Sequence, residues 1–373
     1  MIGLFLPTSQ KDIQNLYDFS SDNSAAPWMA FFALRGAKSK DDGRAHSLTQ
    51  VAPTSDLSVA ILFKFDSSSE HYCNERLLNL RHSSFKKYKN TNLDLYYYIL
   101  LKRISMCFGL NDAYKHPFKD ADYETKFYED LSRLFWTDAI EAFPNQTFKP
   151  IFDELRKIIL DTRYLSVTPT SKDKKTITDI NKETRLLVVS GSIEHVSLEY
   201  FSGSNLMRCD RYGIRPGVQV YKRGTWLNPS KFGFLGKLKN QDEVMPPEEF
   251  MKHFKLTEIA YYPMKEQKYE NCPMTTYDAA VLAILIDLCP NFKLEQVRLI
   301  YKSLTSFLRE QSALILFDEV CEYLQGTKNR EISQLLYTLL AEVHVAIRIS
   351  PEKLPHSRLL NEMALYLMKS LEE

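Results

Sequence analysis

This chain of 373 residues contains a histidine, an aspartate and a cysteine in the order that is typical of one class of thiol enzymes. Cys272 opens an apolar stretch with a helical pattern, and the positive end of a helix dipole favours thiolate over thiol. His195 and Asp210 lie upstream, separated by the length of one hairpin. In thiol catalysis the thiolate attacks a carbonyl, an imidazole carries the proton, and a carboxylate holds the imidazole in its working tautomer. We therefore predict acyl-transfer chemistry with Cys272 as nucleophile, His195 as base and acid, and Asp210 as the orienting group.

Gln267 is the fourth candidate catalytic residue. It lies a few positions before Cys272, on the segment that leads into the predicted helix. A side-chain amide at that place is a suitable donor to the oxyanion that forms when a thiolate attacks a carbonyl. We expect Gln267 to serve as the oxyanion donor.

The elements that must position these residues are predicted from hydrophobic periodicity. Residues 195–201 alternate, which places His195, Ser197 and Glu199 on one face of a strand and the apolar residues between them on the other. A hairpin turn is expected at 202–205. Further strands are expected at 185–189, 206–212, 218–221 and 257–262, with a short helix from 246 to about 254 and a helix from 272 to about 288.

The rest of the chain is expected to be mainly helical. Apolar residues recur every three or four positions from about 93 to 160, and from 294 to 373 the pattern predicts four or so amphipathic helices. Residues 59–65 are a candidate strand, and 168–176 is polar and is expected to be a loop. We predict an α+β protein in which a central mixed sheet is packed by helices. The expected parts are an accessory region at 1–170, a catalytic core at 171–290 and a C-terminal helical region at 291–373.

The amino-acid composition disfavours several classes of function, among them nucleic-acid binding and metal binding. The chain is 44% hydrophobic and 25% charged with a formal net charge of +1, which argues against nucleic acid as a partner. Its six cysteines form no Cys-x-x-Cys pair and no zinc-like spacing with histidines, so we expect free thiols in a reducing, cytoplasmic environment, with no metal and no cofactor. We expect neither a signal peptide nor a transmembrane segment, and the pattern leaves the oligomeric state open.

Three blocks resemble the ubiquitin-like protease (Ulp/SENP, clan CE) family of cysteine proteases. The blocks are Arg185–Leu198, Met207–Asp210 and Ile259–Cys272, and the resemblance extends over about residues 183–288. It implies a papain-like, Ulp-type core that cleaves ubiquitin or a ubiquitin-like modifier from its conjugates. The helical flanks resemble those of bacterial effector deubiquitinases, which implies secretion by a pathogen into the host cytosol.

The chain departs from that family at three positions and in one spacing, since Gln267 lies one residue closer to the cysteine than is usual there. Val196 follows the histidine where the family has Trp, Asn271 precedes the cysteine where it has Asp, and Pro273 follows it where it has Gly. Proline suits the first position of a helix but removes a backbone N–H beside the thiol. The oxyanion would then depend on the N–H of Cys272 itself and on Gln267.

Two other functions remain open at this stage. A YopJ-like acyltransferase has the same His–acid–Cys order, but such enzymes commonly use Glu as the acid and need a basic inositol-phosphate pocket. Asp210 and the balanced charge weigh against that reading. The other alternative is a non-catalytic interaction protein with a degenerate site, which a large distance between His195 and Cys272 would favour.

Overall fold

The structure is a computed structural model of the whole chain. It describes residues 93–109, 121–143, 148–164, 185–191, 195–212, 215–223, 247–266, 272–326, 329–354 and 356–372, together with 89, 175–176 and 178–180. The candidate strand at 59–65, Gln267 and most of the polar loop at 168–176 lie outside these residues.

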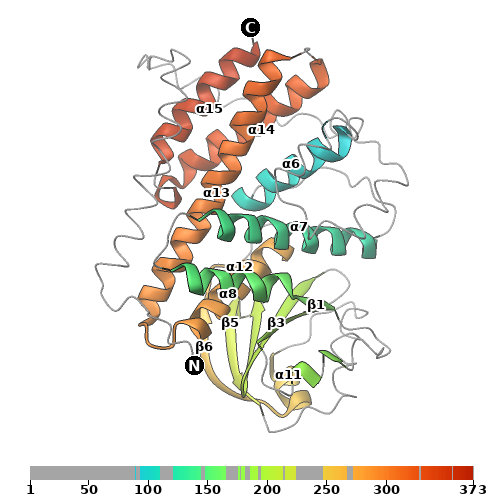
Figure 1. Ribbon diagram of the computed structural model, residues 1–373, viewed down its shortest axis with the longest axis vertical. Helices are drawn as coiled ribbons and strands as arrows, with labels where there is room; N and C mark the ends of the chain where they lie inside the picture. The colour runs from blue at the N-terminus through green and yellow to red at the C-terminus, as the bar shows by residue number, and fades with distance from the viewer. Residues whose placement is uncertain are drawn as a thin grey trace. The chain divides into compact units, whose positions relative to one another are not determined.

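A mixed six-stranded sheet forms the centre of one compact unit (Figure 1). Its strands follow one another in chain order across the sheet, and only the β1–β2 pair is parallel. The α+β class with a mixed sheet is thus confirmed. The strands are β1 Arg163–Tyr164, β2 Leu186–Gly191, β3 Val196–Ser202, β4 Asn205–Asp210, β5 Gly217–Lys222 and β6 Thr257–Pro263.

The β3–β4 hairpin turns at Gly203, as the sequence predicts. Gly203 has φ +55°, a conformation that glycine adopts without the steric cost that a side chain would add. The register pairs Ser202 with Asn205 and Leu198 with Cys209. Strand β4 ends at Asp210, two residues earlier than expected.

Helices cover both faces of the sheet. Helix α12 (Cys272–Leu288) packs across β3, β4 and β5, and α8 (Lys149–Leu160) packs against α12 and β2. Because Tyr200 and Ser202 of β3 both donate hydrogen bonds to Asp287 of α12, this helix lies on the face formed by the even-numbered residues of β3. Helix α7 (Ala121–Ala142) belongs to the same unit up to Glu141.

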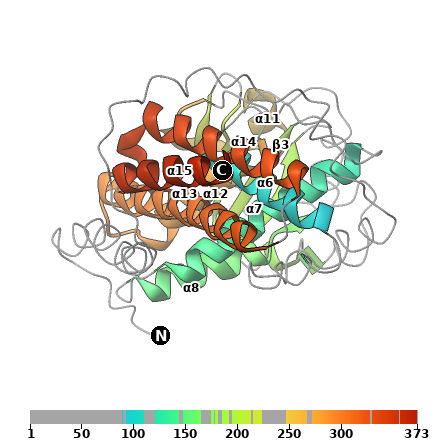
Figure 2. The same ribbon diagram turned by 90° about the horizontal axis from the view of Figure 1, so that it is seen from above.

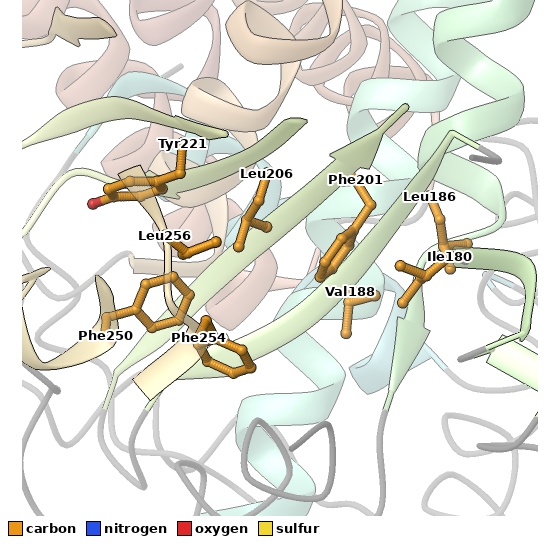
Figure 3. Close-up of a cluster of buried hydrophobic side chains, with 9 residues drawn as sticks. All are labelled: Ile180, Leu186, Val188, Phe201, Leu206, Tyr221, Phe250, Phe254 and Leu256. Carbon is orange, nitrogen blue, oxygen red and sulfur yellow. The ribbon is translucent and has the colours of Figure 1, made fainter. Parts of the chain in front are cut away.

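Helix α11 (Pro247–Phe254) covers the opposite face. Its Phe250 and Phe254 are buried against side chains of β2, β3, β4 and β5 in one apolar cluster (Figure 3). Burying a Phe side chain stabilises a fold by about 1.5–3 kcal/mol, so this cluster holds α11 against the sheet. The strand members of the cluster are Leu186, Val188, Phe201, Leu206 and Tyr221.

The described residues of the second compact unit are mainly helical. It contains α6 (Leu93–Phe108), α13 (Leu294–Gln325) from Lys302 onward, α14 (Arg330–Ile349), the short 3-10 helix η4 (Pro351–Lys353) and α15 (Ser357–Glu372). Helices α14 and α15 lie side by side (Figure 2). Since α13 is continuous over 32 residues, three α-helices and one 3-10 turn occupy the region where four or so helices were expected.

A buried carboxylate joins α6 to α13 within this helical unit. Glu319 is 1% exposed and accepts hydrogen bonds from the hydroxyls of Tyr96 and Tyr97, at 2.6 and 2.9 Å. The ammonium of Lys89 lies 2.6 Å from the same carboxylate. Burial and the neighbouring carboxylate raise the pKa of both tyrosines, which therefore stay protonated and donate.

Helix α14 is long and apolar enough to cross a membrane by length and composition alone. Half of its most apolar stretch is buried inside the fold, and the helix packs against α6, η4 and α15. The core helix of a water-soluble protein meets the same criterion, so the expectation of no transmembrane segment stays a prediction.

The compact units do not coincide with a linear division of the chain. Helices α7 and α8, which fall within the expected accessory region 1–170, group with the sheet. The residues of α13 up to Tyr301 also group with the sheet, although they lie beyond 290. The functional division at 170 and 290 stays a prediction.

Two glycines provide a stability test of the sheet. Gly217 has φ +139°, and a Cβ there would lie 2.3 Å from the backbone oxygen of Tyr262, whereas Gly203 has open space around its Cα. We expect Gly217→Ala to lower the free energy of unfolding by about 3 kcal/mol and Gly203→Ala by about 1 kcal/mol, measured by urea denaturation. Equal losses in the two variants would contradict the close approach of β5 and β6.

Candidate functional site

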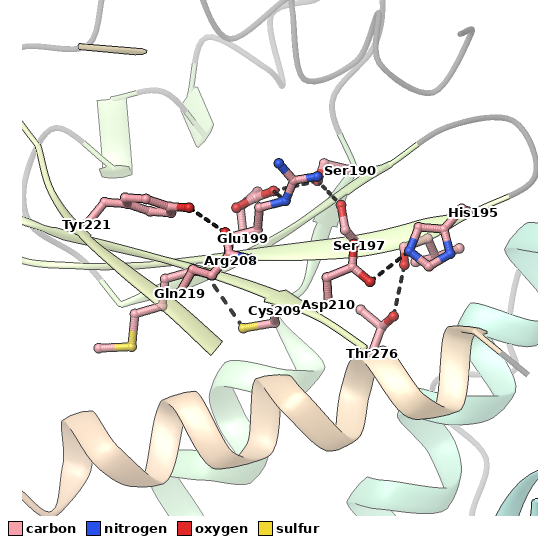
Figure 4. Close-up of polar contacts among 12 residues, drawn as sticks. Ser190, His195, Ser197, Glu199, Arg208, Cys209, Asp210, Gln219, Tyr221 and Thr276 are labelled. Carbon is pink, nitrogen blue, oxygen red and sulfur yellow. Dashed lines mark hydrogen bonds and ion pairs between the residues drawn. The ribbon is translucent and has the colours of Figure 1, made fainter. Parts of the chain in front are cut away.

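His195 and Asp210 lie in direct contact at one end of the sheet (Figure 4). The Nε2 atom of His195 is 2.8 Å from Oδ1 of Asp210, and the two residues are 6% and 4% exposed. Water competes weakly for such a shielded pair, so the carboxylate orients the ring strongly. With Nε2 directed at the carboxylate, Nδ1 is the ring atom that faces away from the acid.

The β3–β4 register explains this contact. Continued beyond the Leu198–Cys209 pair, it places Tyr212 opposite His195 and Asp210 opposite Ser197. Asp210 is therefore a diagonal neighbour of His195 on the same face, within reach of an imidazole. The ring of Tyr212 lies against the His195 ring, with centroids 4.9 Å apart.

A second hydrogen bond fixes the carboxylate of Asp210. The backbone N–H of Tyr212 donates to Oδ1 of Asp210 at 2.9 Å, because the chain turns directly after β4. Tyr212 is 54% exposed, so an aromatic surface stands open to solvent beside the histidine. The backbone of Tyr212 thus holds the carboxylate of Asp210, and the aromatic ring of Tyr212 covers one side of His195.

The start of α12 is anchored next to His195. The hydroxyl of Thr276 donates to the carbonyl of Val196 at 2.8 Å, and Val196 directly follows the histidine (Figure 4). Cys272 is the first residue of α12 and lies one helical turn before Thr276, on the same side of the helix. The helix start that Cys272 occupies is therefore held at the same end of the sheet as the His195–Asp210 pair.

Arg211 adds a further connection at this end of the sheet. Its Nη1 atom lies 2.8 Å from Oδ2 of Asp278 in α12, and its Nε donates to the carbonyl of Lys265 at 2.9 Å. Lys265 belongs to the stretch that follows β6 and leads toward Cys272. One side chain thus joins the end of β4, helix α12 and the stretch that follows β6.

A buried polar network occupies the centre of the sheet face that carries His195 and Asp210. Glu199 is 1% exposed; its Oε1 accepts a hydrogen bond from Ser190 at 2.9 Å and lies 3.9 Å from Nε of Arg208. Ser190 and Ser197 are also in hydrogen-bond contact, at 2.7 Å. Burial raises the pKa of Glu199 to about 7, and the charge of Asp210 adds to this rise.

The environment of Cys209 does not suit a nucleophilic thiol. It is fully buried in β4, and burial together with the charges of Glu199 and Asp210 raises the pKa of its thiol well above the ordinary value. Such a thiol stays protonated and is a poor nucleophile. The position of Cys272 at a helix start favours the opposite behaviour.

The four predicted site residues therefore stand as follows. His195 and Asp210 are in contact, and the backbone of Cys272 is placed at the start of α12. Gln267 lies outside the residues that the structure describes. Within the described ranges, no group of three or more His, Cys, Asp or Glu side chains is arranged to hold a metal ion.

Sequence reasoning missed Thr276, Arg211 and Tyr212. Thr276 had a signal, because it lies one helical turn after Cys272 and a hydroxyl there faces the same side. Arg211 had only its position next to Asp210, and its two partners, Lys265 and Asp278, lie far along the chain in other segments. Charge type alone does not identify which of many carboxylates an arginine will meet.

Comparison with known proteins gives a fold relationship. The sequence matches no protein-family profile and no curated protein. The structure is similar to the solved structure of the Legionella effector AnkH, with a TM-score of 0.51 and 14% sequence identity. The match covers 96% of this chain and 92% of that chain. At this identity the similarity shows a shared fold alone.

The buried acid gives a pH prediction. A carboxyl whose pKa rises from 4.5 in the unfolded chain to about 7 in the fold binds more protons when folded across that interval. The free energy of unfolding therefore falls as pH rises from about 4.5 to about 7. We expect Glu199→Gln to remove up to about 3 kcal/mol of this fall, measured by urea denaturation across that range. An identical pH dependence in the variant would contradict the raised pKa.

Proposed function

We propose that this protein is a thiol protease or isopeptidase with a papain-like, Ulp-type core that cleaves ubiquitin or a ubiquitin-like modifier. The observation that carries the proposal is the shielded His195–Asp210 contact at 2.8 Å, at the sheet end where Thr276 anchors the start of α12. The modifier as substrate rests on the sequence resemblance. The proposed nucleophile is Cys272.

The geometry supports a two-step reaction. Nδ1 of His195 takes the proton of the Cys272 thiol while Asp210 holds Nε2, and the thiolate attacks the carbonyl carbon at the modifier's C-terminus. The C–N bond breaks, the leaving amine takes the proton from His195, and a thioester remains. His195 then removes a proton from water, the hydroxide attacks the thioester, and the thiol is restored with release of the modifier's carboxylate.

The oxyanion requires donors beside the thiol. Pro273 provides no N–H, so in this proposal the backbone N–H of Cys272 and the side-chain amide of Gln267 stabilise the oxyanion. Pro273 also suits the first turn of α12, where its missing N–H leaves no intrahelical hydrogen bond unmade.

The proposed setting is the cytosol of a host cell. One structural neighbour is an effector of Legionella, and the resemblance of the helical flanks to bacterial effector deubiquitinases suggests the same kind of role here. A host cytosol is reducing, which suits a catalytic thiol and four described cysteines that form no disulfide. The proposed partners are conjugates of ubiquitin or a ubiquitin-like protein.

The two cysteines at opposite ends of α12 give a matched test of the nucleophile. We expect Cys272→Ala to abolish covalent reaction with ubiquitin or ubiquitin-like probes that carry a C-terminal vinyl warhead, because the attacking sulfur is gone. Cys289, whose thiol pKa burial raises to about 12, should be dispensable, so Cys289→Ala should react like the wild type. Gel shift and mass spectrometry measure both. Continued reaction of Cys272→Ala at another cysteine would overturn the assignment.

Asp210→Asn tests the orienting carboxylate. We expect kcat to fall by roughly 10²-fold or more with KM little changed, because the amide no longer favours the tautomer and charge that His195 needs. A modifier with a C-terminal fluorogenic amide measures the rate, and the thermal melting temperature checks that the variant folds.

The acyltransferase alternative makes a different prediction in the same assay series. An acyltransferase would transfer label from acetyl-CoA to protein in the presence of inositol hexakisphosphate and would leave the modifier probes unreacted. That pair of results would contradict the proposed hydrolase.

A further inference from the structure

Arg211 makes two contacts whose partners come from separate parts of the chain. The residue directly follows Asp210 at the end of β4. Its guanidinium lies 2.8 Å from the carboxylate of Asp278 and donates to the carbonyl of Lys265 at 2.9 Å. The side chains of Arg211 and Asp278 are only 15% and 10% exposed.

The two partners of Arg211 lie on segments that must be brought close to His195 for thiol catalysis. Asp278 lies on α12, in the second turn after Cys272, and Lys265 precedes the residues that lead from β6 to the same cysteine. Arg211 itself is bonded through the backbone to Asp210, which holds His195. A shift of α12 along its axis would therefore move Cys272 relative to His195 and would strain the contact between Arg211 and Asp278.

The chemistry of the side chain suits this arrangement. A guanidinium has donors in a rigid planar fork, so it meets a carboxylate with one arm and a backbone carbonyl with another. A lysine ammonium carries the same charge but has no such fork. Arg211 and Asp278 are both largely shielded from solvent. Their ion pair therefore differs from an ordinary surface ion pair, which stabilises a protein by roughly 0–1 kcal/mol.

We propose that Arg211 is a positioning residue, which fixes the start of α12 and the segment before it against the His195–Asp210 pair and so sets the distance between the thiol and the imidazole. This inference rests on the proposed function. Its expected effect is on the rate, because a misplacement of about 1 Å costs up to roughly 10²-fold in a reaction that depends on alignment.

The chain offers a matched control at the other end of α12. There the Nε atom of Arg185 lies 2.8 Å from Oδ2 of Asp287, so a second arginine beside a strand meets a second aspartate on the same helix. Asp287 and Asp278 are nine residues apart, or about 14 Å along the helix. Loss of the Arg185 pair should weaken the hold on α12 without moving its first turn.

The test compares Arg211→Gln, Arg211→Lys and Arg185→Gln in the full chain. The first measurement follows the alkylation of Cys272 by iodoacetamide, at neutral and at alkaline pH, by mass spectrometry of its peptide. The second is kcat and KM with a modifier that carries a C-terminal fluorogenic amide, and the third is the melting temperature.

We expect Arg211→Gln to slow alkylation of Cys272 at neutral pH by about tenfold and kcat by roughly 10–10²-fold, with KM nearly unchanged. Alkaline pH should restore alkylation, since the thiolate then forms without the imidazole. Arg211→Lys should recover part of the rate. Arg185→Gln should match the wild type in both rates, with a loss of melting temperature no larger than that of Arg211→Gln, because Arg185 is more exposed and Asp287 keeps its hydrogen bonds from Tyr200 and Ser202.

A double variant strengthens the comparison. If Arg211 acts through Asp278, the double variant Arg211→Gln/Asp278→Asn should lower kcat by about the same factor as Arg211→Gln alone, because the contact between the two side chains is already lost in the single variant. Asp278→Asn should lower kcat by no more than Arg211→Gln, since it leaves the contact of Arg211 with the carbonyl of Lys265 in place. Multiplied effects would contradict a shared contact.

The failures of the two proposals give different results. If wild-type Cys272 is readily alkylated at neutral pH and Arg211→Gln changes neither rate, the positioning role is wrong and the proposed function stands. Equal losses of rate in Arg211→Gln and Arg185→Gln would reduce Arg211 to a stability effect and would also overturn the positioning role. If wild-type Cys272 behaves as an ordinary thiol and no modifier probe reacts, both proposals are wrong.

Discussion

The register of the β3–β4 hairpin is the constraint on which the candidate site depends. The turn at Gly203 sets the pairing of the two strands, and that pairing makes Asp210 the diagonal neighbour of His195 and places Tyr212 opposite it. A slip by one residue would turn Asp210 to the other face of the sheet and would separate it from the imidazole. The same slip would turn Leu206 of β4 away from the apolar cluster that holds α11 against the sheet.

Burial on both faces has a second consequence for this sheet. The face that carries His195 holds an apolar cluster with α11 at one end and the histidine pair at the other, and polar residues fill the space between them. Glu199 is the most costly of these, since a buried carboxyl must be paired or protonated. Ser190 donates a hydrogen bond to its carboxylate, and the charge of Arg208 lies nearby. Burial nevertheless raises its pKa to about 7, so that the carboxyl is partly protonated near neutral pH. The site therefore adjoins a group whose charge changes near neutral pH.

Local pattern accounted for much of what the structure shows. The period-two alternation at 195–201, the Gly203 turn and the helix that begins at Cys272 are all properties of short stretches, and each agrees with the structure. Strand β1 was missed because two residues carry no periodicity; it exists only as a parallel neighbour of β2. The continuous α13 was expected as shorter helices, since an amphipathic pattern does not distinguish one long helix from two consecutive ones.

The sequence by itself determined the hairpin that joins His195 to Asp210, because turn chemistry and strand alternation act between neighbours in the chain. It also determined that Cys272 begins a helix. Only the tertiary structure decided that α12 is anchored beside the histidine, through Thr276 and Arg211. Those contacts join residues far apart in the chain, where many donors and acceptors are chemically equivalent, and packing of α12 across the sheet selects which of them meet.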